Sequence, residues 1–377
     1  MYMYSEEMKR VGRPSSSMAQ EEQEEDRLSS LPDVLLIYIL SFIDTKLSIQ
    51  LSILSKRWVN LWTLLPVLNF NSSLFYHQTR KFSTIFTFDY FIDQVLSRRN
   101  SCIKIDTLNI QVTDYKTLVR VFNFALLNCV PNLSIDSSEY LTKYRPISCE
   151  NSSHDLTSLS LKGMMSFGRF PLFVGLVKLR LERVKIVESE PFSYFPNLEE
   201  LFLVNCKMEG GLSKGIEVIG LKLLRLSISS CFYHPVPYEK IVLLTPKLLV
   251  FELDGLIPMS FEAEVPVVET VYIDCCFSFS RLADRNVHQP SEYQQKENLI
   301  NIFRCLRNAK YVHLSPSTVK LLSLSQSKLV EEASPFGNLK VLNLIPPPNK
   351  PMVELHSSVA AYLLKGSPAV VVKAMPR

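Results

Sequence analysis

The sequence has few of the features that carry enzymatic chemistry. It contains 11 glycines and 6 histidines in 377 residues. It has no glycine-rich loop of the kind that cradles phosphate and no G-x-S-x-G nucleophile elbow. No histidine stands at a zinc-ligand spacing from a cysteine or a carboxylate. These absences predict a non-catalytic protein that needs no metal or cofactor, and they leave the hypothesis of an enzyme without supporting residues.

Long apolar runs and an excess of charge of one sign are also missing. The stretch Val34–Ile43 is interrupted by Ser41 and is far shorter than the roughly 20 residues that span a bilayer. Because 41 Lys and Arg face 37 Asp and Glu, for a net charge of +4, neither nucleic acid nor a membrane is an expected partner. The N-terminal residues lack the apolar core of a signal peptide. The 8 cysteines are therefore expected to be reduced, in the cytoplasm, the nucleus or both.

The composition is that of a folded protein, with 47% hydrophobic and 21% charged residues. Residues 1–25 are polar and then acidic, which predicts a disordered arm. A compact helical module is predicted over 26–70. Its first helix starts near Pro32 and Asp33, residues that suit a first helical turn, and Ser30 is placed to cap it.

The module carries more apolar side chains than a unit of its size can bury. Leu36, Ile39, Leu40 and Ile43 recur at helical spacing in the first helix. Asp44 or Thr45 can cap a second helix, and Pro66 ends the helical pattern. The apolar stripe of that second helix comprises Leu47, Leu51, Leu54, Trp58 and Leu61. Further apolar residues fall off both stripes: Leu35, Ile37, Tyr38, Ile49 and Ile53. Helices that are apolar on more than one face are typical of burial on two sides, so the module is expected to bind a partner.

Beyond the module the sequence repeats itself. After a predicted helical linker or cap at 71–104, the pattern apolar-x-x-apolar-x-apolar recurs through 105–345. Its first residues are Ile105, Val130, Leu156, Leu176, Leu198, Leu223, Leu248, Val268, Ala309 and Leu339. Most repeats start about 20 to 29 residues apart, the spacing of leucine-rich repeats. Amphipathic helices are predicted around 88–96 and 118–126, and 346–377 is a C-terminal tail.

The repeat predicts an α/β solenoid. Each unit supplies one short strand whose alternate side chains point inward, and only stacking on its neighbours buries them. The expected architecture is an N-terminal three-helix module followed by an irregular horseshoe of parallel strands. Cys206, Cys231 and Cys276 follow their strands where the chain turns inward, so they are expected to be buried structural thiols.

Five short motifs in the module give it a family resemblance. They are Leu31-Pro32-Asp33, Ile39-Leu40-Ser41-Phe42, Thr45-Lys46, Leu54-Ser55-Lys56-Arg57-Trp58 and Leu61-Trp62. Together they resemble the plant form of the F-box sequence. With the repeats, the chain resembles a plant F-box/LRR-repeat protein. Many members of that family carry a further FBD domain, of which Met352–Leu355 gives no full copy. The sequence is also irregular between Asp136 and His154, where the repeat register is uncertain.

The resemblance implies a substrate receptor of an SCF-type cullin–RING ubiquitin ligase. The F-box would dock on an SKP-family adaptor, which connects to cullin and RING subunits, and the repeats would hold an unknown protein substrate. Carried over by position, the adaptor-binding residues are Leu31, Pro32, Leu35, Leu36, Ile39, Leu40, Leu51, Leu54, Ser55 and Trp58. The alternative for each of them is that it only packs the core of the module. The alternative for the protein is a non-catalytic interaction module that binds the adaptor or other partners without assembling a ligase.

The repeats also predict where a substrate binds. Residues between the inward-facing ones lie on the concave surface, which is the usual binding face of a solenoid. The candidates on that face are Lys178, Arg180, Phe202, Arg225, Glu252, Asp254, Tyr272 and Asp274. Because aromatic side chains are enriched at binding hot spots, we expect a partner with apolar anchors flanked by charge of both signs. An ordinary solvated sheet face is the alternative.

Overall fold

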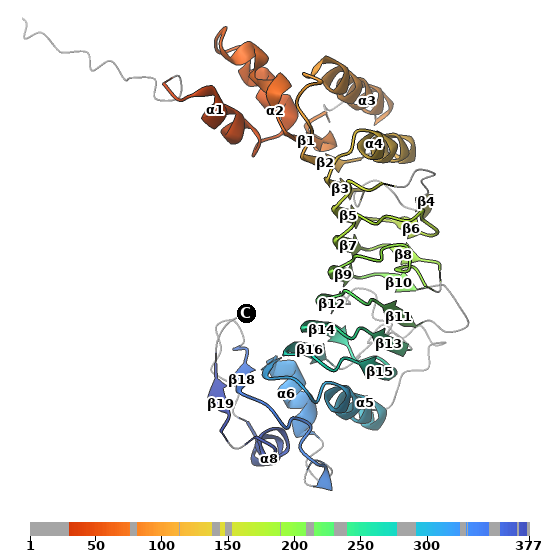
Figure 1. Cartoon of the computed structure of the whole chain (residues 1–377), viewed down its shortest axis with the longest axis vertical. Coiled ribbons are helices and arrows are strands. Elements are labelled where there is room, and N and C mark those ends of the chain that lie inside the picture. Colours follow the sequence, from red (N-terminus) through yellow and green to blue (C-terminus); the bar gives the residue numbers. More distant parts are fainter. Residues whose placement is uncertain are drawn as a thin grey trace, which may run out of the picture.

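The computed structural model describes most of the chain from residue 30 onward. The described residues are 30–75, 81–112, 114–137, 144–147, 153–188, 190–208, 215–229, 240–276, 292–324, 329, 331–346, 355–367 and 369–374. The predicted disordered arm, residues 1–25, lies outside them. The described residues form an arc of stacked short strands, with a group of helices at its N-terminal end (Figure 1).

The N-terminal module contains three short helices. Pro32 occupies the cap position of the first, so the prediction that Ser30 would cap it was wrong. Asp44 caps the second, and its side chain accepts a hydrogen bond from the backbone N–H of Lys46. The helices are α1 (Asp33–Leu40), α2 (Thr45–Leu51) and the 3₁₀ helix η1 (Trp58–Leu64).

The predicted second helix is broken in two. Its apolar stripe continues at helical spacing from Leu47 to Leu61, yet α2 ends at Leu51 and the chain turns before η1 begins at Trp58. In the turn, Arg57 Nη2 lies 2.6 Å from Asp33 Oδ1 at the start of α1. This ion pair joins the two ends of the module, and the turn lets Trp58 and Leu61 reach its core. A contact between residues this far apart in sequence outweighs local helical spacing.

One long parallel sheet forms the concave side of the arc. Each strand pairs in parallel with the strand of the next repeat, and the sheet contains every strand of the ten predicted repeats. Its strands, in order, are β1 (Val67–Asn71), β2 (Thr107–Gln111), β3 (Asn132–Asp136), β5 (Ser158–Lys162), β7 (Lys178–Glu182), β9 (Glu200–Val204), β12 (Arg225–Ser229), β14 (Val250–Leu256), β16 (Thr270–Cys276), β17 (Tyr311–Leu314), β18 (Val341–Leu344) and β19 (Val371–Lys373).

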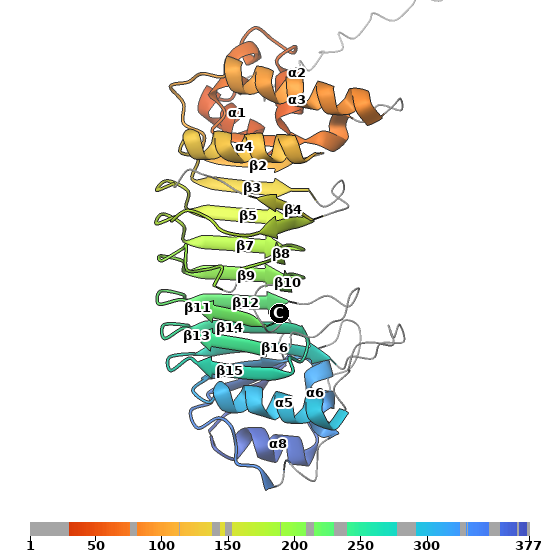
Figure 2. The ribbon, with the colours of Figure 1, turned by 90° about the vertical axis from the view of Figure 1, so that its right-hand side faces the viewer.

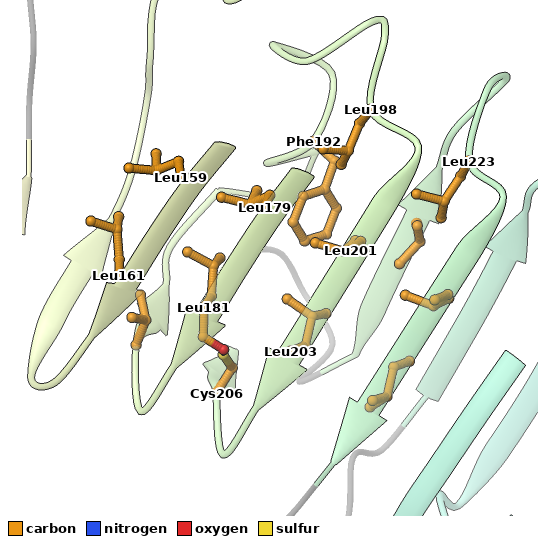
Figure 3. Close-up of a cluster of buried hydrophobic side chains, with 14 of the residues drawn as sticks. Leu159, Leu161, Leu179, Leu181, Phe192, Leu198, Leu201, Leu203, Cys206 and Leu223 are labelled. Carbon is orange, nitrogen blue, oxygen red and sulfur yellow. The ribbon is translucent and has the colours of Figure 1, made fainter. Parts of the chain in front are cut away.

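Alternation of side chains explains both the strands and their stacking. In β9, Leu201 and Leu203 are fully buried, whereas the residues between and beside them are half-exposed. The paired register sets Leu201 beside Leu179 and Leu203 beside Leu181. Figure 3 shows these leucines in continuous rows on the inner face of the repeats. A single strand could not hide them, so burial depends on the neighbouring repeats.

A left-handed residue follows three successive strands. Gly163, Arg183 and Asn205 come directly after β5, β7 and β9 and have φ values of 119°, 59° and 53°. The backbone N–H of Gly163 donates to Glu182 O at 2.9 Å, and that of Arg183 donates to Val204 O at 2.8 Å. The turns therefore continue the hydrogen-bond ladder while they redirect the chain toward the convex side.

Helices cover the two ends of the convex side, and short strands cover its middle (Figure 2). The N-terminal end has α3 (Lys81–Arg98) and α4 (Tyr115–Leu127), which confirm the two predicted amphipathic helices. The C-terminal end has α5 (Glu292–Cys305), α6 (Pro316–Ser323) and α8 (Ser357–Leu364). The middle has β4 (Arg145–Ile147), β6 (Met165–Phe167), β8 (Lys185–Ile186) and β10 (Lys207–Met208) in one sheet, and β11 (Ile216–Ile219), β13 (Lys240–Leu244) and β15 (Ser260–Glu264) in another.

The fold is the predicted one, a helical N-terminal module followed by an α/β solenoid of leucine-rich repeats. The main sheet extends past the predicted repeat range of 105–345 at both ends. Most of its first strand, β1, lies within the predicted module, and its last strand, β19, lies within the predicted tail. The strand that follows the helical module therefore belongs to the same sheet as the strands of the repeats.

Candidate functional site

The first candidate site is an apolar face of the N-terminal module that remains exposed. On α1 and just beyond it, Val34, Tyr38 and Phe42 are 76%, 62% and 70% exposed. The rings of Tyr38 and Phe42 meet edge to face, 4.8 Å apart. Ile53 and Leu54, in the turn after α2, are 86% and 68% exposed. So many large apolar side chains on one small unit indicate a surface for a partner protein.

The opposite face of α1 packs inside the chain. Leu36 and Leu40 are fully buried, one helical turn apart, and they share a core with Trp58 and Leu61. The helix therefore divides its apolar residues between its own core and solvent, as the two-sided pattern of the sequence indicates.

The ten predicted adaptor-binding residues fall into three groups. Pro32, Leu35, Ile39 and Leu54 are exposed, whereas Leu31, Leu51 and Ser55 are half-buried. Leu36, Leu40 and Trp58 are buried, at 0%, 1% and 6% exposure. These last three have a core role instead, because a side chain without exposed surface offers none to a partner.

Sequence reasoning omitted several residues of the exposed face. Val34, Tyr38, Phe42 and Ile53 were not among the adaptor candidates, yet each is more exposed than Leu35 or Ile39. The signal that could have found them is that they are apolar yet fall off the helical stripes, which indicates a second apolar face.

A polar clasp joins the module to the first strand of the solenoid. The side-chain N–H groups of Asn69, on β1, donate to the carbonyl oxygens of Ser41 and Ile43 at 2.9 and 3.0 Å. The backbone N–H of Asn69 donates to Thr45 Oγ1 at 2.9 Å. On the next repeat, Asn109 Nδ2 donates to Asn69 Oδ1 at 2.8 Å. Asn69 therefore bonds to the module on one side and to the solenoid on the other.

Asp44 is the second half of the clasp. Its Oδ2 accepts from the backbone N–H of Asn71, on β1, at 2.9 Å, while its Oδ1 caps α2. Burial raises the pKa of the Asp44 carboxyl above its ordinary value, although the hydrogen bonds from Lys46 and Asn71 oppose that shift. Because Asp44 bonds to both α2 and β1, it fixes the orientation of the module on the sheet.

The second candidate site is the concave face of the sheet. All eight predicted substrate-binding residues lie on it. Residues that are paired in register across neighbouring strands form three rows on this face, and the eight residues are distributed over these rows. Lys178 and Arg225 share the first row, and Asp254 and Asp274 the third. The middle row runs Arg180, Phe202, Ser227, Glu252, Tyr272 and His313. Seven of the eight are at least partly exposed, and Glu252 is 6% exposed.

Ion pairs cross the concave face between neighbouring strands. Lys178 Nζ lies 2.8 Å from Glu200 Oε2, and Arg225 pairs with Glu252. The ring of Phe202 has Lys178 Nζ 5.3 Å and Arg225 Cζ 5.8 Å from its centroid, within cation–π range. Lys178, Phe202, Arg225 and Glu252 are therefore connected across the neighbouring strands β7, β9, β12 and β14.

The structure also bears on metals, membranes and thiols. Among the described residues, no group of three or more His, Cys, Asp or Glu side chains is arranged to hold a metal ion. Nor does any described helix combine the length and hydropathy needed to cross a bilayer. Cys206 is buried, donates to Leu181 O at 3.4 Å and has its pKa raised to about 12 by burial, as expected for an inert structural thiol. Cys231 lies outside the described residues.

Fold and sites together define the class of protein. It is a leucine-rich-repeat solenoid with a wide polar concave face, joined at its N-terminal end to a helical module with an exposed apolar face. Such a chain has two separate candidate binding surfaces.

Comparison with known proteins gives the family. The F-box domain model matches residues 28–70, which include α1, α2, η1 and most of β1. The putative F-box/FBD/LRR-repeat protein At4g03220 of Arabidopsis thaliana is 26% identical over 354 residues, 85% of this chain and 68% of its own length. The F-box/FBD/LRR-repeat protein At5g22660 of the same plant is 32% identical over 212 residues, 55% of this chain and 44% of its own length. The chain thus contains an F-box domain and is a distant homologue of Arabidopsis F-box/LRR-repeat and F-box/FBD/LRR-repeat proteins.

Identity is higher over a shorter stretch. The F-box/FBD/LRR-repeat protein At2g04230 of Arabidopsis thaliana is 57% identical over 49 residues, 13% of this chain and 11% of its own length. An F-box domain implies binding to a Skp1-like adaptor, and F-box proteins usually act in SCF ligases. Their F-box/LRR members are generally non-catalytic.

Proposed function

We propose that this chain is the substrate-recognition subunit of an SCF-type cullin–RING ubiquitin ligase. Its F-box docks on an SKP-family adaptor, and its repeats hold the protein to be ubiquitinated. The observation that carries the proposal is the exposed apolar face of α1 within a matched F-box domain. The chain itself contributes proximity, because catalysis belongs to other subunits of the complex.

The adaptor-binding surface is best described by the exposed apolar residues of the module. Leu35, Ile39 and Leu54, three of the family-derived positions, are 46%, 41% and 68% exposed. Tyr38, on α1, and Phe42, just beyond it, are also exposed and contact each other. Aromatic and aliphatic side chains of this kind commonly dominate protein interfaces. Leu31 and Pro32 precede α1, and Arg57 donates to the carbonyl of Leu31, which holds that approach in place.

The attachment of the module to the sheet supports the role of a bridge. Asn69 and Asp44 bond the F-box to β1, and β1 pairs along its length with β2. A target held on the concave face would therefore stand at a fixed position relative to the adaptor. A constrained position favours transfer because it raises the effective concentration of the target near the catalytic subunits.

Co-purification tests the docking surface. The triple variant Leu35→Ala, Ile39→Ala and Leu54→Ala is expected to lose the adaptor, cullin and RING subunits that the wild type recovers. Each residue is substantially exposed, so the free energy of unfolding should change by only about 0.5 kcal/mol per site. The matched control is Leu221→Ala with Val267→Ala, which removes apolar side chains that are 71% and 45% exposed on the repeats.

Each outcome has a clear meaning. Loss of the adaptor in the triple variant, with retention in the control, supports docking through α1. Full retention of the adaptor by the triple variant would contradict this surface. Recovery of the adaptor without cullin by the wild type would favour the alternative of an interaction module that does not assemble a ligase.

A further inference from the structure

The concave face is divided into a basic part and an acidic part. On strands β5 to β12 the outward-facing charged residues are Lys162, Lys178, Arg180, Glu182, Glu200 and Arg225, which include twice as many cations as carboxylates. On the next two strands, β14 and β16, they are Glu252, Asp254 and Asp274, and no cation faces outward. The charge therefore changes sign across neighbouring strands of one continuous surface.

The basic part is accessible although its cations are paired. The side chains of Lys178, Arg180 and Arg225 are 49%, 44% and 44% exposed. The pair between Lys178 and Glu200 is solvated on both sides, at 49% and 39% exposure, and solvated pairs contribute little free energy. A carboxylate from a partner can replace Glu200 there at small cost, and it can join the exposed guanidinium groups of Arg180 and Arg225.

Two carboxylates of the acidic part lie side by side, which suits a cationic side chain of a partner. Asp254 and Asp274 are directly opposite each other in the paired register of β14 and β16. Like charges at opposed positions of neighbouring strands are destabilising. Asp254 also accepts a hydrogen bond from Ser229 Oγ at 2.9 Å.

An aromatic pair lies beside these carboxylates. The rings of Tyr272 and His313 stack with centroids 4.1 Å apart and planes 17° apart. Tyr272 is on the same strand as Asp274, two residues before it and on the same side of the sheet. An aromatic surface next to carboxylates suits the side chain of Lys or Arg, which can stack its stem and pair its charge.

We propose that this face binds an extended peptide segment of a target with acidic side chains at one end and Lys or Arg at the other. The acidic end lies over β7 to β12, and the basic end over Asp254, Asp274 and the Tyr272–His313 pair. From β7 to β16 the sheet advances four strand spacings, about 19 Å. An extended chain covers that distance in about six residues. The inference rests on the proposed role of the repeats as the target-binding part.

Peptide binding to the full-length chain, without adaptor, tests the proposal. Two fluorescent peptides have the same composition: one carries two glutamates, a glycine–serine centre and two lysines in blocks, and the other alternates the charges. Fluorescence anisotropy should show the block peptide binding at least about fivefold more tightly. Asp254→Asn with Asp274→Asn should weaken its binding about five- to tenfold, the effect of two solvated charge contacts.

Charge reversal and a convex-side control sharpen the test. Asp254→Lys with Asp274→Lys should make the chain prefer a peptide with glutamates at both ends. Glu217→Gln with Glu264→Gln removes two exposed carboxylates from the convex strands β11 and β15 and should leave affinity unchanged. Equal binding of block and alternating peptides, or no binding at millimolar concentration, would overturn the proposal. Neither result affects adaptor co-purification, so the two proposals fail separately.

Discussion

The F-box and the repeats differ in how much of their apolar side chains they expose to solvent. In β9, Leu201 is 0% exposed because strands on both sides cover it, whereas Ile53 in the F-box is 86% exposed. A repeat finds its partners within the same chain, one strand spacing away. The F-box adjoins the solenoid through β1, and among the described residues its apolar side chains away from β1, such as Ile53, are exposed. The difference shows that a stacked unit completes its own core, while a unit at the end of the stack leaves apolar surface for another protein.

Truncation of a leucine in each region should give the largest contrast. Leu201→Ala is expected to lower the free energy of unfolding by about 2–5 kcal/mol, because it leaves a cavity between strands that cannot close. Leu54→Ala, at a side chain that is 68% exposed, should change it by less than about 0.5 kcal/mol. Urea unfolding measures both. Similar losses in the two variants would mean that the F-box face is covered within the chain.

The clasp between the two regions should give the next largest effect. Asn69→Ala leaves the carbonyl oxygens of Ser41 and Ile43 and the amide of Asn109 without their partner. The expected loss is about 1–3 kcal/mol, with faster hydrogen exchange across 41–45. The control Asn128→Ala removes an exposed side-chain bond to Phe124 O and should cost less than about 0.5 kcal/mol. Unchanged exchange in Asn69→Ala would show that the clasp does not fix the F-box.

A smaller gain is expected within the repeats. Arg183 has a φ of 59°, in the left-handed region that costs an L-residue about 1 kcal/mol. Arg183→Gly removes that cost, and after the added entropy of the unfolded chain it should raise the free energy of unfolding by about 0.5 kcal/mol. Ser160→Gly, in the extended strand β5, should lower it by a similar amount. Denaturant melts of both variants measure these changes. A lower free energy of unfolding in Arg183→Gly would contradict the prediction.

The smallest effect concerns pH at the junction. The pKa of Asp44 is raised by burial in the folded chain, so its contribution to stability is present below the unfolded-state pKa of about 3.9 and is lost as pH rises through the folded-state pKa. Asp44→Asn removes this titration. Relative to wild type, the free energy of unfolding of Asp44→Asn should therefore increase between about pH 3 and pH 6. Urea melts at both pH values measure it, and a constant difference would mean that Asp44 does not titrate abnormally.

Sequence alone predicted the repeats because their strands obey one local rule. Each unit has inward-facing apolar residues at the same spacing, as in Leu198, Leu201 and Leu203. Stacking requires this spacing in every unit, because each inward side chain packs on the equivalent one of the next repeat. The convex strands β8 and β10 were not predicted because they are two residues long and form only through pairing with their neighbours. The strand β1 was missed because Leu68 and Phe70 lie directly after a helical pattern.

The sequence predicted the exposed side chains of the concave face better than those of the F-box, for a related reason. On the concave face a period of two fixes which side each residue takes, so all eight predicted residues lie on that face. In the F-box the helical period gave two apolar faces and could not tell which one packs inside. The predicted adaptor contacts therefore include Leu36 and Leu40, which are buried, and omit Tyr38 and Phe42, which are exposed.

The sequence by itself determined the order of the parts, a helical module and then stacked strands, because spacing of apolar residues is local information. It also determined which charged residues lie on the concave face, since successive side chains of a strand alternate between the two faces of the sheet. Only the tertiary structure decided which face of α1 is open, how α2 ends before η1, and how Asn69 and Asp44 fasten the F-box to the sheet. These depend on contacts between residues more than twenty positions apart, whose free energy outweighs the local preferences that a sequence pattern records.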